Sequence, residues 1–325
     1  MKNLLRLSYG AICSFKRDVR DYMFWKQYNR HPNIHVVNYW RDQPLEQLWL
    51  YRFMKARNLL PSRDLLLMSS LGSRRLANMF GGGQSIFFVG ENVRQVAFLQ
   101  YADLMLTDPR TKLALGFDYF EDERYLRFPL WILYHFSPEA DEKEIRDTCQ
   151  RLRYPMDSED RNRFATMIAS HDVDDIRKRI TELLEPISAV SCAGKLLHND
   201  DSLWKQYKDN KSAYMRSFRY NICPENSNAM GYVTEKLFQA IQAGCIPIYW
   251  GSYNQPEPNI INPQAVLFFD KEGNNEQLVK TIYTLENNPK AYNDFANLPR
   301  LLPTAEECIM DMFSSLEQKI KQVIE

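Results

Sequence analysis

The sequence predicts an α/β protein built from two doubly wound, Rossmann-like domains. In both halves of the 325-residue chain, short and nearly continuous apolar runs alternate with amphipathic segments. That alternation is typical of parallel strands covered on both faces by helices. The length exceeds what one compact core usually holds, and the polar stretch over residues 137–163 separates the halves. We therefore expect domains over residues 1–155 and 156–303, and a C-terminal amphipathic helix over residues 304–325.

The first half carries five apolar runs that we interpret as strands. A helix is expected over residues 44–57, where Leu45, Leu48 and Tyr51 lie near helical spacing between the first two runs. The expected strands cover residues 34–39, 64–69, 86–89, 103–107 and 112–117.

The second half repeats the alternation and ends in a long helix. Helices are expected over residues 175–184 and 235–243, between strands over residues 164–170, 218–223, 245–250 and 266–270. Near the C-terminus, residues 303–307 have the pattern of a capping box, with Thr304 before two glutamates. Apolar residues then follow at spacings of three and four, which predicts an amphipathic helix.

Ligands of doubly wound sheets bind beyond the carboxyl ends of the strands. Two such domains that face each other leave a cleft between these edges. We expect the functional site in that cleft.

Charge and composition exclude several classes of protein. Lys plus Arg and Asp plus Glu both number 41, so the net charge is zero and no strong field exists to attract nucleic acid. The six cysteines form no C-x-x-C pair, which favours reduced thiols. Because no segment reaches about 20 apolar residues, we expect a cytoplasmic protein.

Residues 1–30 are basic, with seven Lys or Arg against two Asp. The apolar residues among these charges fall at helical spacing, as in an amphipathic helix that rests on the inner face of an anionic membrane: Ile12, Phe15, Val19, Tyr22 and Met23. A helix packed on its own domain is the favoured alternative.

The segment Phe218–Gly251 breaks a local rule. Thr234 is placed to cap the helix over residues 235–243, yet Lys236 follows in its first turn, beside the positive end of the helix dipole. A diphosphate at this helix N-terminus would offset the cost, and Glu235 is placed to accept hydrogen bonds from a ribose diol. A ligand-free, exposed Glu-Lys pair remains the alternative.

Asp172-Val173-Asp174 has the form of a D-x-D metal site, but a different interpretation is favoured. Together with Asp175, these residues precede an expected helix, where acidic side chains cap backbone N–H groups. We therefore predict no metal site and no required cofactor, which leaves room for stimulation by Mn²⁺ or Mg²⁺.

Several segments resemble the α-1,3/4-fucosyltransferases of glycosyltransferase family 10, particularly the soluble bacterial members. The segments are P-E-N-S at Pro224, G-Y-V-T-E-K at Gly231, C-I-P-I-Y-W-G at Cys245, F-F-V-G-E-N at Phe87 and R-Y-L-R-F-P-L at Arg124, with an arginine at Arg177. The resemblance implies a GT-B fold, in which two Rossmann-like domains face each other across a cleft. It also implies that the C-terminal domain binds GDP-fucose and the N-terminal domain binds the acceptor.

Site residues carry over from the resemblance by position. It implies that Glu91 is the general base. It also implies a donor site in which Arg177 and Lys236 hold the pyrophosphate, Glu235 the ribose, Tyr232 the guanosine-phosphate region and Asn226 the fucose or phosphate side, with Glu225 lining the fucose pocket.

These residue types suit an inverting transfer. A base takes the proton of the acceptor hydroxyl while a diphosphate leaves as a stable anion, so one carboxylate and nearby cations suffice. The expected reaction is transfer of L-fucose from GDP-fucose to a GlcNAc hydroxyl, most readily O3, of a lactosamine-type oligosaccharide or lipopolysaccharide, with a Lewis-antigen-like product. A GT-B transferase that uses another sugar nucleotide and a non-catalytic glycan-binding protein are the alternatives.

The sequence departs from the family pattern at two places. Pro224 stands where an aromatic residue is frequent, and Val93-Arg94 follow Glu91-Asn92 where small or prolyl residues are frequent. The second departure lies on the acceptor side. Several nearby aromatic residues are candidates for stacking on acceptor sugars, with core packing as the alternative: Phe117, Tyr119, Phe120, Trp131 and Tyr134.

Overall fold

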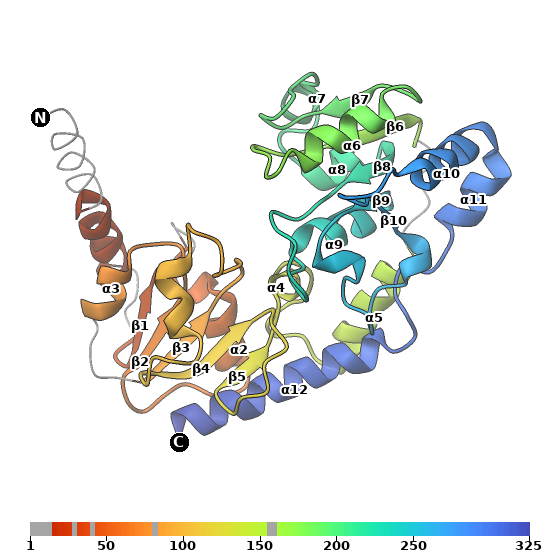
Figure 1. The fold of residues 1–325 in the computed structure, drawn as a ribbon. Helices are drawn as coiled ribbons and strands as arrows, with labels where there is room; N and C mark the ends of the chain where they lie inside the picture. Colours follow the sequence, from red (N-terminus) through yellow and green to blue (C-terminus); the bar gives the residue numbers. More distant parts are fainter. Residues whose placement is uncertain (1–14, 28–30, 40–42, 80–83, 155–160) are drawn as a thin grey trace, which may run out of the picture. The chain divides into compact units, whose positions relative to one another are not determined.

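The computed structural model describes residues 15–27, 31–39, 43–79, 84–154 and 161–325. The chain forms two compact units (Figure 1). Unit 1 comprises the residues up to Leu133, Ser137–Ala140 and Asp311–Glu325; unit 2 comprises Tyr134–Phe136 and Asp141–Met310. Each unit holds one parallel sheet, which confirms the predicted α/β class.

Unit 1 contains a five-stranded parallel sheet in the order β1-β2-β3-β4-β5. Four of its strands match the predicted apolar runs. The fifth, β5, has only three residues and was not predicted from the sequence. The strands are β1 (Ile34–Val37), β2 (Leu65–Met68), β3 (Gln84–Phe88), β4 (Thr111–Gly116) and β5 (Tyr125–Arg127).

The prediction of a strand over residues 103–107 is wrong. The 3-10 helix η2 (Leu99–Leu104) and a turn occupy this region. Tyr101, Leu104 and Met105 are buried in the core of unit 1, at the spacing of a helix rather than the alternation of a strand. A short apolar run does not by itself distinguish the two structures.

Helices cover the sheet of unit 1. The apolar side chains of α2 (Trp49–Ala56), which follows η1 (Leu45–Gln47), meet those of the last helix, α12 (Ala305–Ile324). The other helices are α3 (Arg74–Met79), α4 (Leu130–His135), whose last residues belong to unit 2, and a helix over residues 15–27.

The helix over residues 15–27 packs on unit 1 and also exposes an apolar stripe. Trp25 is buried and Tyr22 packs against the core. Phe15, Val19 and Met23 are exposed on the opposite side of this helix. The favoured prediction of a helix packed on its own domain is therefore confirmed for residues 15–27; the rest of the basic segment, residues 1–14 and 28–30, lies outside the described residues.

Unit 2 contains a parallel sheet in the order β10-β9-β8-β6-β7. From β6 the chain first adds β7 on one side, and β8, β9 and β10 then extend the sheet on the other. The order therefore reverses between β6 and β8, which is the switch point where doubly wound sheets bind ligands. The strands are β6 (Arg163–Met167), β7 (Val190–Cys192), β8 (Phe218–Ile222), β9 (Ile246–Tyr249) and β10 (Leu267–Phe268).

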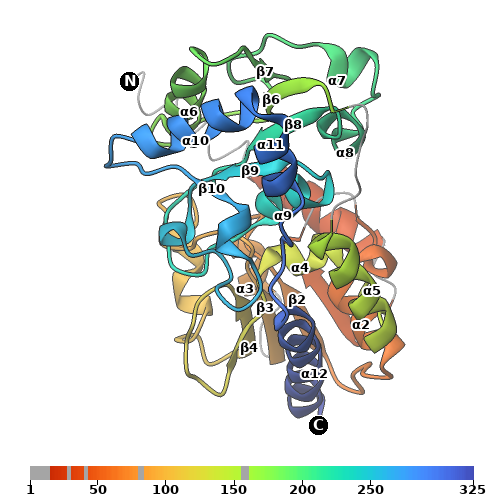
Figure 2. The same ribbon diagram turned by 90° about the vertical axis from the view of Figure 1, so that its right-hand side faces the viewer.

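Helices pack on both faces of the second sheet (Figures 1 and 2). Ala165 and Met167 of β6 point to the face covered by α6 and α10, whereas Thr166 points the other way and bonds to Tyr214 of α8. The helices of unit 2 are α5 (Glu142–Arg153), α6 (Ile176–Leu184), α7 (Ser202–Lys205), α8 (Lys211–Met215), α9 (Glu235–Gln242), α10 (Glu276–Asn287) and α11 (Pro289–Ala296), with 3-10 turns η3 (Ser252–Asn254) and η4 (Pro263–Ala265).

The units divide near residue 140 rather than at the predicted residue 155. Helix α5 starts with a capping box formed by Asp141 and Glu144, and its apolar side is buried in unit 2. Arg153 binds Glu306 and the carbonyl oxygen of Leu302. The polar surface of α5 gave it the appearance of a linker, although its other face belongs to the second core.

The terminal helix is confirmed, but its predicted capping box is not. The hydroxyl of Thr304 donates to the carbonyl oxygen of Asn259, and Glu306 pairs with Arg153. From Asp311 onward, α12 belongs to unit 1, where Phe313 packs on Trp49 and Phe53. Within the described part of the chain, no helix combines the length and apolarity that a membrane span requires.

Candidate active site

The loops that follow β6 and β8 meet at the switch point of unit 2 and carry most of the predicted donor residues. The first loop leads into α6, whose second residue is Arg177. The second loop runs from Cys223 to the N-cap residue Thr234 and contains Glu225 and Asn226.

Arg177 joins these two loops. Its Nη2 atom donates to the carbonyl oxygen of Pro224 and to Oδ1 of Asn226, both at 3.0 Å. Its Nη1 atom donates to the carbonyl oxygen of His171 at 3.3 Å. The residue is 4% exposed, and burial lowers the pKa of its guanidinium. The cation that the resemblance implies for the pyrophosphate is therefore held rigidly across the crevice.

Glu225 is a fully buried carboxylate that organises the start of α9. Its Oε1 atom accepts from the backbone N–H of Thr234 at 2.8 Å, and its Oε2 atom accepts from the Thr234 hydroxyl at 2.6 Å. Lys236 Nζ lies 3.3 Å from the same Oε2 atom and 2.8 Å from the Thr234 hydroxyl oxygen. The side chain of Glu225 has no exposed surface, so its influence on a ligand runs through Thr234 and Lys236.

Close packing against Glu225 requires a glycine at position 251. The backbone there has φ of 144°, and an added Cβ atom would lie 2.7 Å from Cγ of Glu225. Any side chain would displace the carboxylate, which explains glycine after β9.

Acidic neighbours balance the charge of Lys236 within the protein. Its position beside the helix dipole therefore does not by itself require an anionic ligand. Although burial alone lowers the pKa of Lys236, the carboxylates of Glu225 and Glu235 outweigh that effect and raise the pKa above its ordinary value. The unfavourable placement beside the helix dipole is thus offset by these acids even without an anionic ligand.

Thr234 occupies the N-cap position of α9, but its side chain does not cap the helix. The hydroxyl binds Glu225 and Lys236 instead. The first-turn backbone N–H groups of the helix therefore receive no side-chain cap from Thr234, and they lie beside an ammonium group. Uncapped N–H groups beside a cation suit a phosphate oxygen.

The remaining donor candidates lie in the same region. Glu235 is partly exposed, with its carboxylate 3.6 Å from Lys236 Nζ. Tyr232 is buried and close enough to Arg177 to influence its pKa. Unit 2 thus brings Arg177, Glu225, Asn226, Tyr232, Glu235 and Lys236 into one cluster, and their individual ligand contacts stay predictions.

Asp172 acts as a cap for α6, as its position predicted. Its two carboxylate oxygens accept from the backbone N–H groups of Arg177 at 3.0 Å and Lys178 at 2.9 Å. Asp174 pairs with Lys271 at 2.9 Å, and the side chain of Asp175 makes no capping bond to α6. The predicted capping role is confirmed for Asp172 and is wrong for Asp174 and Asp175.

Glu91, the predicted base, belongs to unit 1 and follows the carboxyl end of β3. The residue before it is Gly90, where an added Cβ atom would lie 2.9 Å from Leu130. The residue after it is the buried Asn92, whose side chain accepts from the backbone N–H of Arg94 at 3.1 Å. Glu91 is therefore held between two anchored residues, and the F-F-V-G-E-N and R-Y-L-R-F-P-L segments meet at Gly90 and Leu130.

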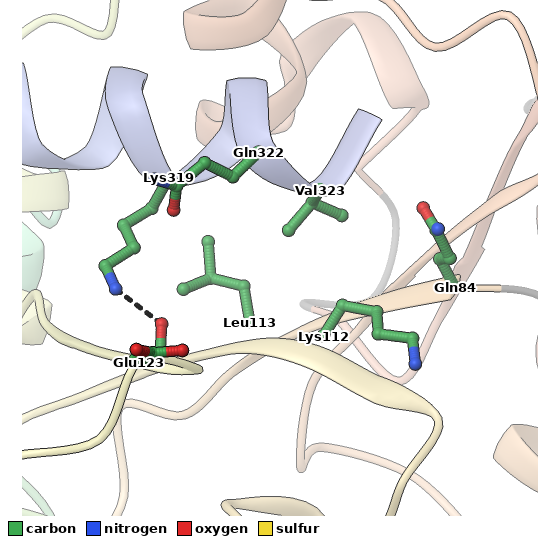
Figure 3. Close-up of a pocket in the computed structure, with 7 residues that line it drawn as sticks. All are labelled: Gln84, Lys112, Leu113, Glu123, Lys319, Gln322 and Val323. Carbon is green, nitrogen blue, oxygen red and sulfur yellow. Dashed lines mark hydrogen bonds between the residues drawn. The ribbon is translucent and has the colours of Figure 1, made fainter. Parts of the chain in front are cut away.

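A small cavity of about 170 Å³ occupies the opposite end of this sheet (Figure 3). Gln84 and Lys112, at the starts of β3 and β4, line it together with Lys319 of α12. The Lys319 ammonium donates to the carbonyl oxygen of Glu123 across the cavity. Because Glu91 follows the carboxyl end of β3, this cavity is separate from the candidate site.

Two units with parallel sheets, one of which carries a cluster of cations at its switch point, are typical of nucleotide-binding proteins of the two-domain α/β class. The family model described as "Glycosyltransferase family 10 (fucosyltransferase) C-term" matches residues 158–305. The model described as "Alpha-(1,3)-fucosyltransferase FucT N-terminal domain" matches residues 34–134. The chain belongs to glycosyltransferase family 10, the fucosyltransferases.

Individual relatives agree with this assignment. Over 296 residues, the chain is 26% identical to the α-(1,3)-fucosyltransferase FucT of Helicobacter pylori. The aligned part covers 80% of this chain and 58% of that protein. It therefore spans less than two thirds of that relative's length. An α-(1,4)-fucosyltransferase of Arabidopsis thaliana is 31% identical over 98 residues, 30% of this chain and 23% of that protein.

Solved structures show the same fold. A crystal structure of an α1,3-fucosyltransferase superimposes with a TM-score of 0.60 at 23% identity, covering 88% of this chain and 90% of that chain. A crystal structure of an α1,3-fucosyltransferase with GDP-fucose also gives 0.60, at 21% identity and 90% coverage of both chains. The predicted GT-B-like fold is thereby confirmed.

Sequence reasoning missed the supporting interactions of the site. The carbonyl oxygen of Pro224 that receives Arg177 has no signature in the sequence. The bond between Arg94 and Asp118, which links the loops after β3 and β4, joins residues 24 apart and also had no local signal. In the sequence, only the departure from the family pattern at positions 93 and 94 pointed to Arg94.

Proposed function

We propose that this protein transfers L-fucose from GDP-fucose, with inversion, to a GlcNAc hydroxyl of a lactosamine-type glycan. The observation that carries the proposal is the cluster at the switch point of unit 2, where Arg177 bridges both loops and Lys236 lies at the uncapped start of α9. A departing diphosphate needs this combination of fixed cations and backbone N–H groups.

In this proposal Lys236, Arg177 and the N-terminus of α9 hold the diphosphate, and Glu235 binds the ribose. Glu91 accepts the proton of the acceptor hydroxyl as the new glycosidic bond forms to the anomeric carbon and the bond to GDP breaks. Because the protein's own cations stabilise the leaving group, the mechanism requires no metal ion. Rates measured with EDTA and with added Mn²⁺ or Mg²⁺ test this point.

Family membership and the resemblance of the donor segments support the choice of nucleotide, and one related structure was solved with GDP-fucose. The test is stabilisation of this protein against heat by GDP-fucose, compared with UDP- and CDP-sugars. We expect GDP-fucose and GDP to raise the unfolding temperature most. Greater stabilisation by a uridine or cytidine nucleotide would favour the transferase that uses another donor.

The acceptor and linkage need a separate assay. Transfer from GDP-fucose should be measured on Galβ1-4GlcNAc, Galβ1-3GlcNAc and glucose-containing acceptors. We expect product on the 3-hydroxyl of GlcNAc in Galβ1-4GlcNAc, giving a Lewis-type structure. Exclusive formation of 4-linked product would overturn the linkage, and binding of glycans without any transfer would favour the non-catalytic protein.

We also propose that the helix over residues 15–27 contacts an anionic membrane surface while the protein acts in the cytoplasm. Phe15, Val19 and Met23 form an exposed apolar stripe, and Lys16 and Arg20 are exposed on the same helix. An apolar stripe bordered by cations fits the interface of an anionic bilayer.

Cosedimentation with phosphatidylcholine vesicles, with and without phosphatidylglycerol, tests this contact. We expect binding to the anionic vesicles only, reduced by salt and by the double substitution Phe15→Ser and Val19→Ser. Tyr283→Ser, at an exposed position on α10, is the matched control. Equal partition with both kinds of vesicle, or none, would contradict the proposal.

A further inference from the structure

The loops at the carboxyl edge of the unit 1 sheet form a cross-linked surface beside Glu91. In the register of β3 and β4, Phe88 pairs with Leu115, so Glu91 and Asp118 each lie three residues beyond a paired position. Neighbouring strands of a sheet are about 4.8 Å apart. The two loops therefore leave the sheet at the same level and side by side.

Three side chains tie this edge together. The Arg94 guanidinium donates to Oδ1 of Asp118 and so links the loop after β3 to the loop after β4. Arg127, the last residue of β5, donates through Nε to the carbonyl oxygen of Phe117 at 3.0 Å. The backbone N–H of Asp118 donates to the hydroxyl of Tyr125 at 2.8 Å. A surface braced in this way is preorganised for a ligand.

Two aromatic rings stand out from this surface. Tyr119 is 53% exposed and Phe120 is 40% exposed, whereas Phe117 and Trp131 are buried in the core. Core packing therefore explains Phe117 and Trp131, but it does not explain Tyr119 and Phe120. The guanidinium carbon of Arg127 lies 4.5 Å from the centre of the Tyr119 ring, and Phe120 packs edge-on against Tyr125 at 5.1 Å. Both exposed rings are thus held in defined orientations.

The polar partner of these rings is Arg94. Its side chain is about half exposed, while Asp118, its carboxylate partner, is only 5% exposed. A guanidinium carries five N–H donors in a planar fork, more than one carboxylate oxygen can accept. Arg94 is therefore oriented by a buried anchor, and its guanidinium carbon lies 5.9 Å from the centre of the Phe120 ring, at the position where the sequence departs from the family pattern.

We propose that Tyr119, Phe120 and Arg94 form a subsite for a neutral pyranose ring of the acceptor, with Asp118 as the residue that positions Arg94. Aromatic faces bind the C–H face of a sugar, and guanidinium donors bind its hydroxyl oxygens. The adjacent Glu91 loop places this subsite next to the hydroxyl that is deprotonated. The inference rests on the proposed fucosyl transfer and adds the residues that select the acceptor.

The first test measures fucosyl transfer with Tyr119→Ala, Phe120→Ala and Arg94→Met. At saturating GDP-fucose we expect each aromatic truncation to lower kcat/KM for the acceptor about tenfold, mainly through a higher acceptor KM. Arg94→Met should act in the same direction. The KM for GDP-fucose and its slow hydrolysis without acceptor should not change.

Tyr119→Phe and Tyr283→Ala are the controls. The first keeps the ring and should retain acceptor binding; the second removes an equally exposed tyrosine from α10 and should change nothing. Unchanged acceptor KM in both aromatic truncations would overturn the subsite. Absence of transfer by the unsubstituted protein would instead overturn the proposed function, so the two failures are distinguishable.

A second measurement uses the unsubstituted protein. Tetranitromethane nitrates exposed tyrosines, and peptide mass spectrometry quantifies each position. The acceptor glycan that is used most efficiently should protect Tyr119 severalfold and leave Tyr283 unprotected. Equal nitration of Tyr119 with and without that glycan would contradict the proposal whatever the variants show.

Discussion

At the scale of single residues, the candidate site separates groups that are expected to touch ligands from groups that hold them. Arg177 and Lys236 are proposed to supply the charge for the diphosphate, whereas Glu225 and Asp172 fix the start of α9 and of α6. Removing a buried charge partner leaves its counterpart uncompensated, which is costly. Substitutions at the two kinds of residue should therefore have different signatures.

Substitution of Glu91, the proposed base, gives the clearest residue-scale prediction. Glu91→Gln keeps the size of the side chain and removes its ability to accept a proton. We expect kcat to fall by ~10²–10⁴-fold with the affinity for GDP-fucose retained. Steady-state rates and calorimetric titration of GDP-fucose would measure the two quantities. Full activity in this variant would exclude Glu91 as the base.

A second prediction distinguishes a direct from an indirect role of Glu225. Because its side chain is fully buried against Thr234 and Lys236, Glu225→Gln should change the dissociation constants of GDP and GDP-fucose by the same factor. It should also lower the unfolding temperature, because Lys236 loses a buried counter-charge. A selective loss of affinity for GDP-fucose, measured by calorimetry, would instead show direct contact with fucose.

At the scale of elements, a histidine at the end of α4 makes the packing of α9 sensitive to pH. The His135 ring lies 5.7 Å from the ring of Phe238, and neither ring nitrogen makes a well-formed hydrogen bond to a described residue. Burial lowers the pKa of His135 to about 4, against a weaker opposite influence of Glu235. The folded protein therefore keeps this side chain neutral well below its ordinary pKa.

The resulting pH dependence has a definite sign. Between pH ~6.5 and pH 4 the unfolded chain binds a proton at His135 that the folded chain does not, so stability falls as the pH falls through this range. The full effect is about 3 kcal/mol and levels off below pH 4. His135→Phe should remove this contribution, so its unfolding temperature should fall less than that of the unsubstituted protein between pH 7 and pH 4.5. An equal fall in unfolding temperature for the two proteins over this pH range would contradict the prediction.

At the scale of the whole molecule, the chain returns to its first unit at the end. Residues 311–325 of α12 complete unit 1, although they follow all of unit 2 in the sequence. Phe313 is buried against three aromatic residues, Trp49, Phe53 and Phe128, at centroid distances of 5.8, 5.9 and 6.1 Å. The first core is therefore incomplete until the last residues have been added.

Truncating this contact should weaken unit 1. Phe313→Ala removes a buried aromatic ring and should lower the free energy of unfolding by about 3–5 kcal/mol. Ser314→Ala, at the exposed neighbouring position, is the control and should have little effect. Thermal unfolding monitored by tryptophan fluorescence would measure both. A small effect of Phe313→Ala would show that α12 contributes little to this core.

The sequence by itself determined the α/β class, eight of the ten described strands and the helices next to the donor segments. These follow from local periodicity, because a buried strand or an amphipathic helix needs its apolar residues at a set spacing. It also indicated the donor residues and Glu91, because their motifs resemble a family. Asp172 was correctly interpreted as a cap from its position alone.

Two strands were not predicted, β5 (Tyr125–Arg127) and β7 (Val190–Cys192), and the strand predicted over residues 103–107 is wrong. Three-residue strands carry too little periodic signal to be read from a sequence, and a short apolar run fits a 3-10 turn equally well.

Only the tertiary structure decided which partners the site residues have. Glu225 balances Lys236, Arg177 binds the carbonyl oxygen of Pro224, and Arg94 binds Asp118. It also assigned α5 to unit 2 and the end of α12 to unit 1. These facts depend on contacts between residues distant in the sequence, and local patterns do not encode which distant groups will meet.

 The physical reason is that periodicity reflects a residue's own burial, whereas a charge pair or a buried backbone carbonyl depends on the finished packing of the whole chain.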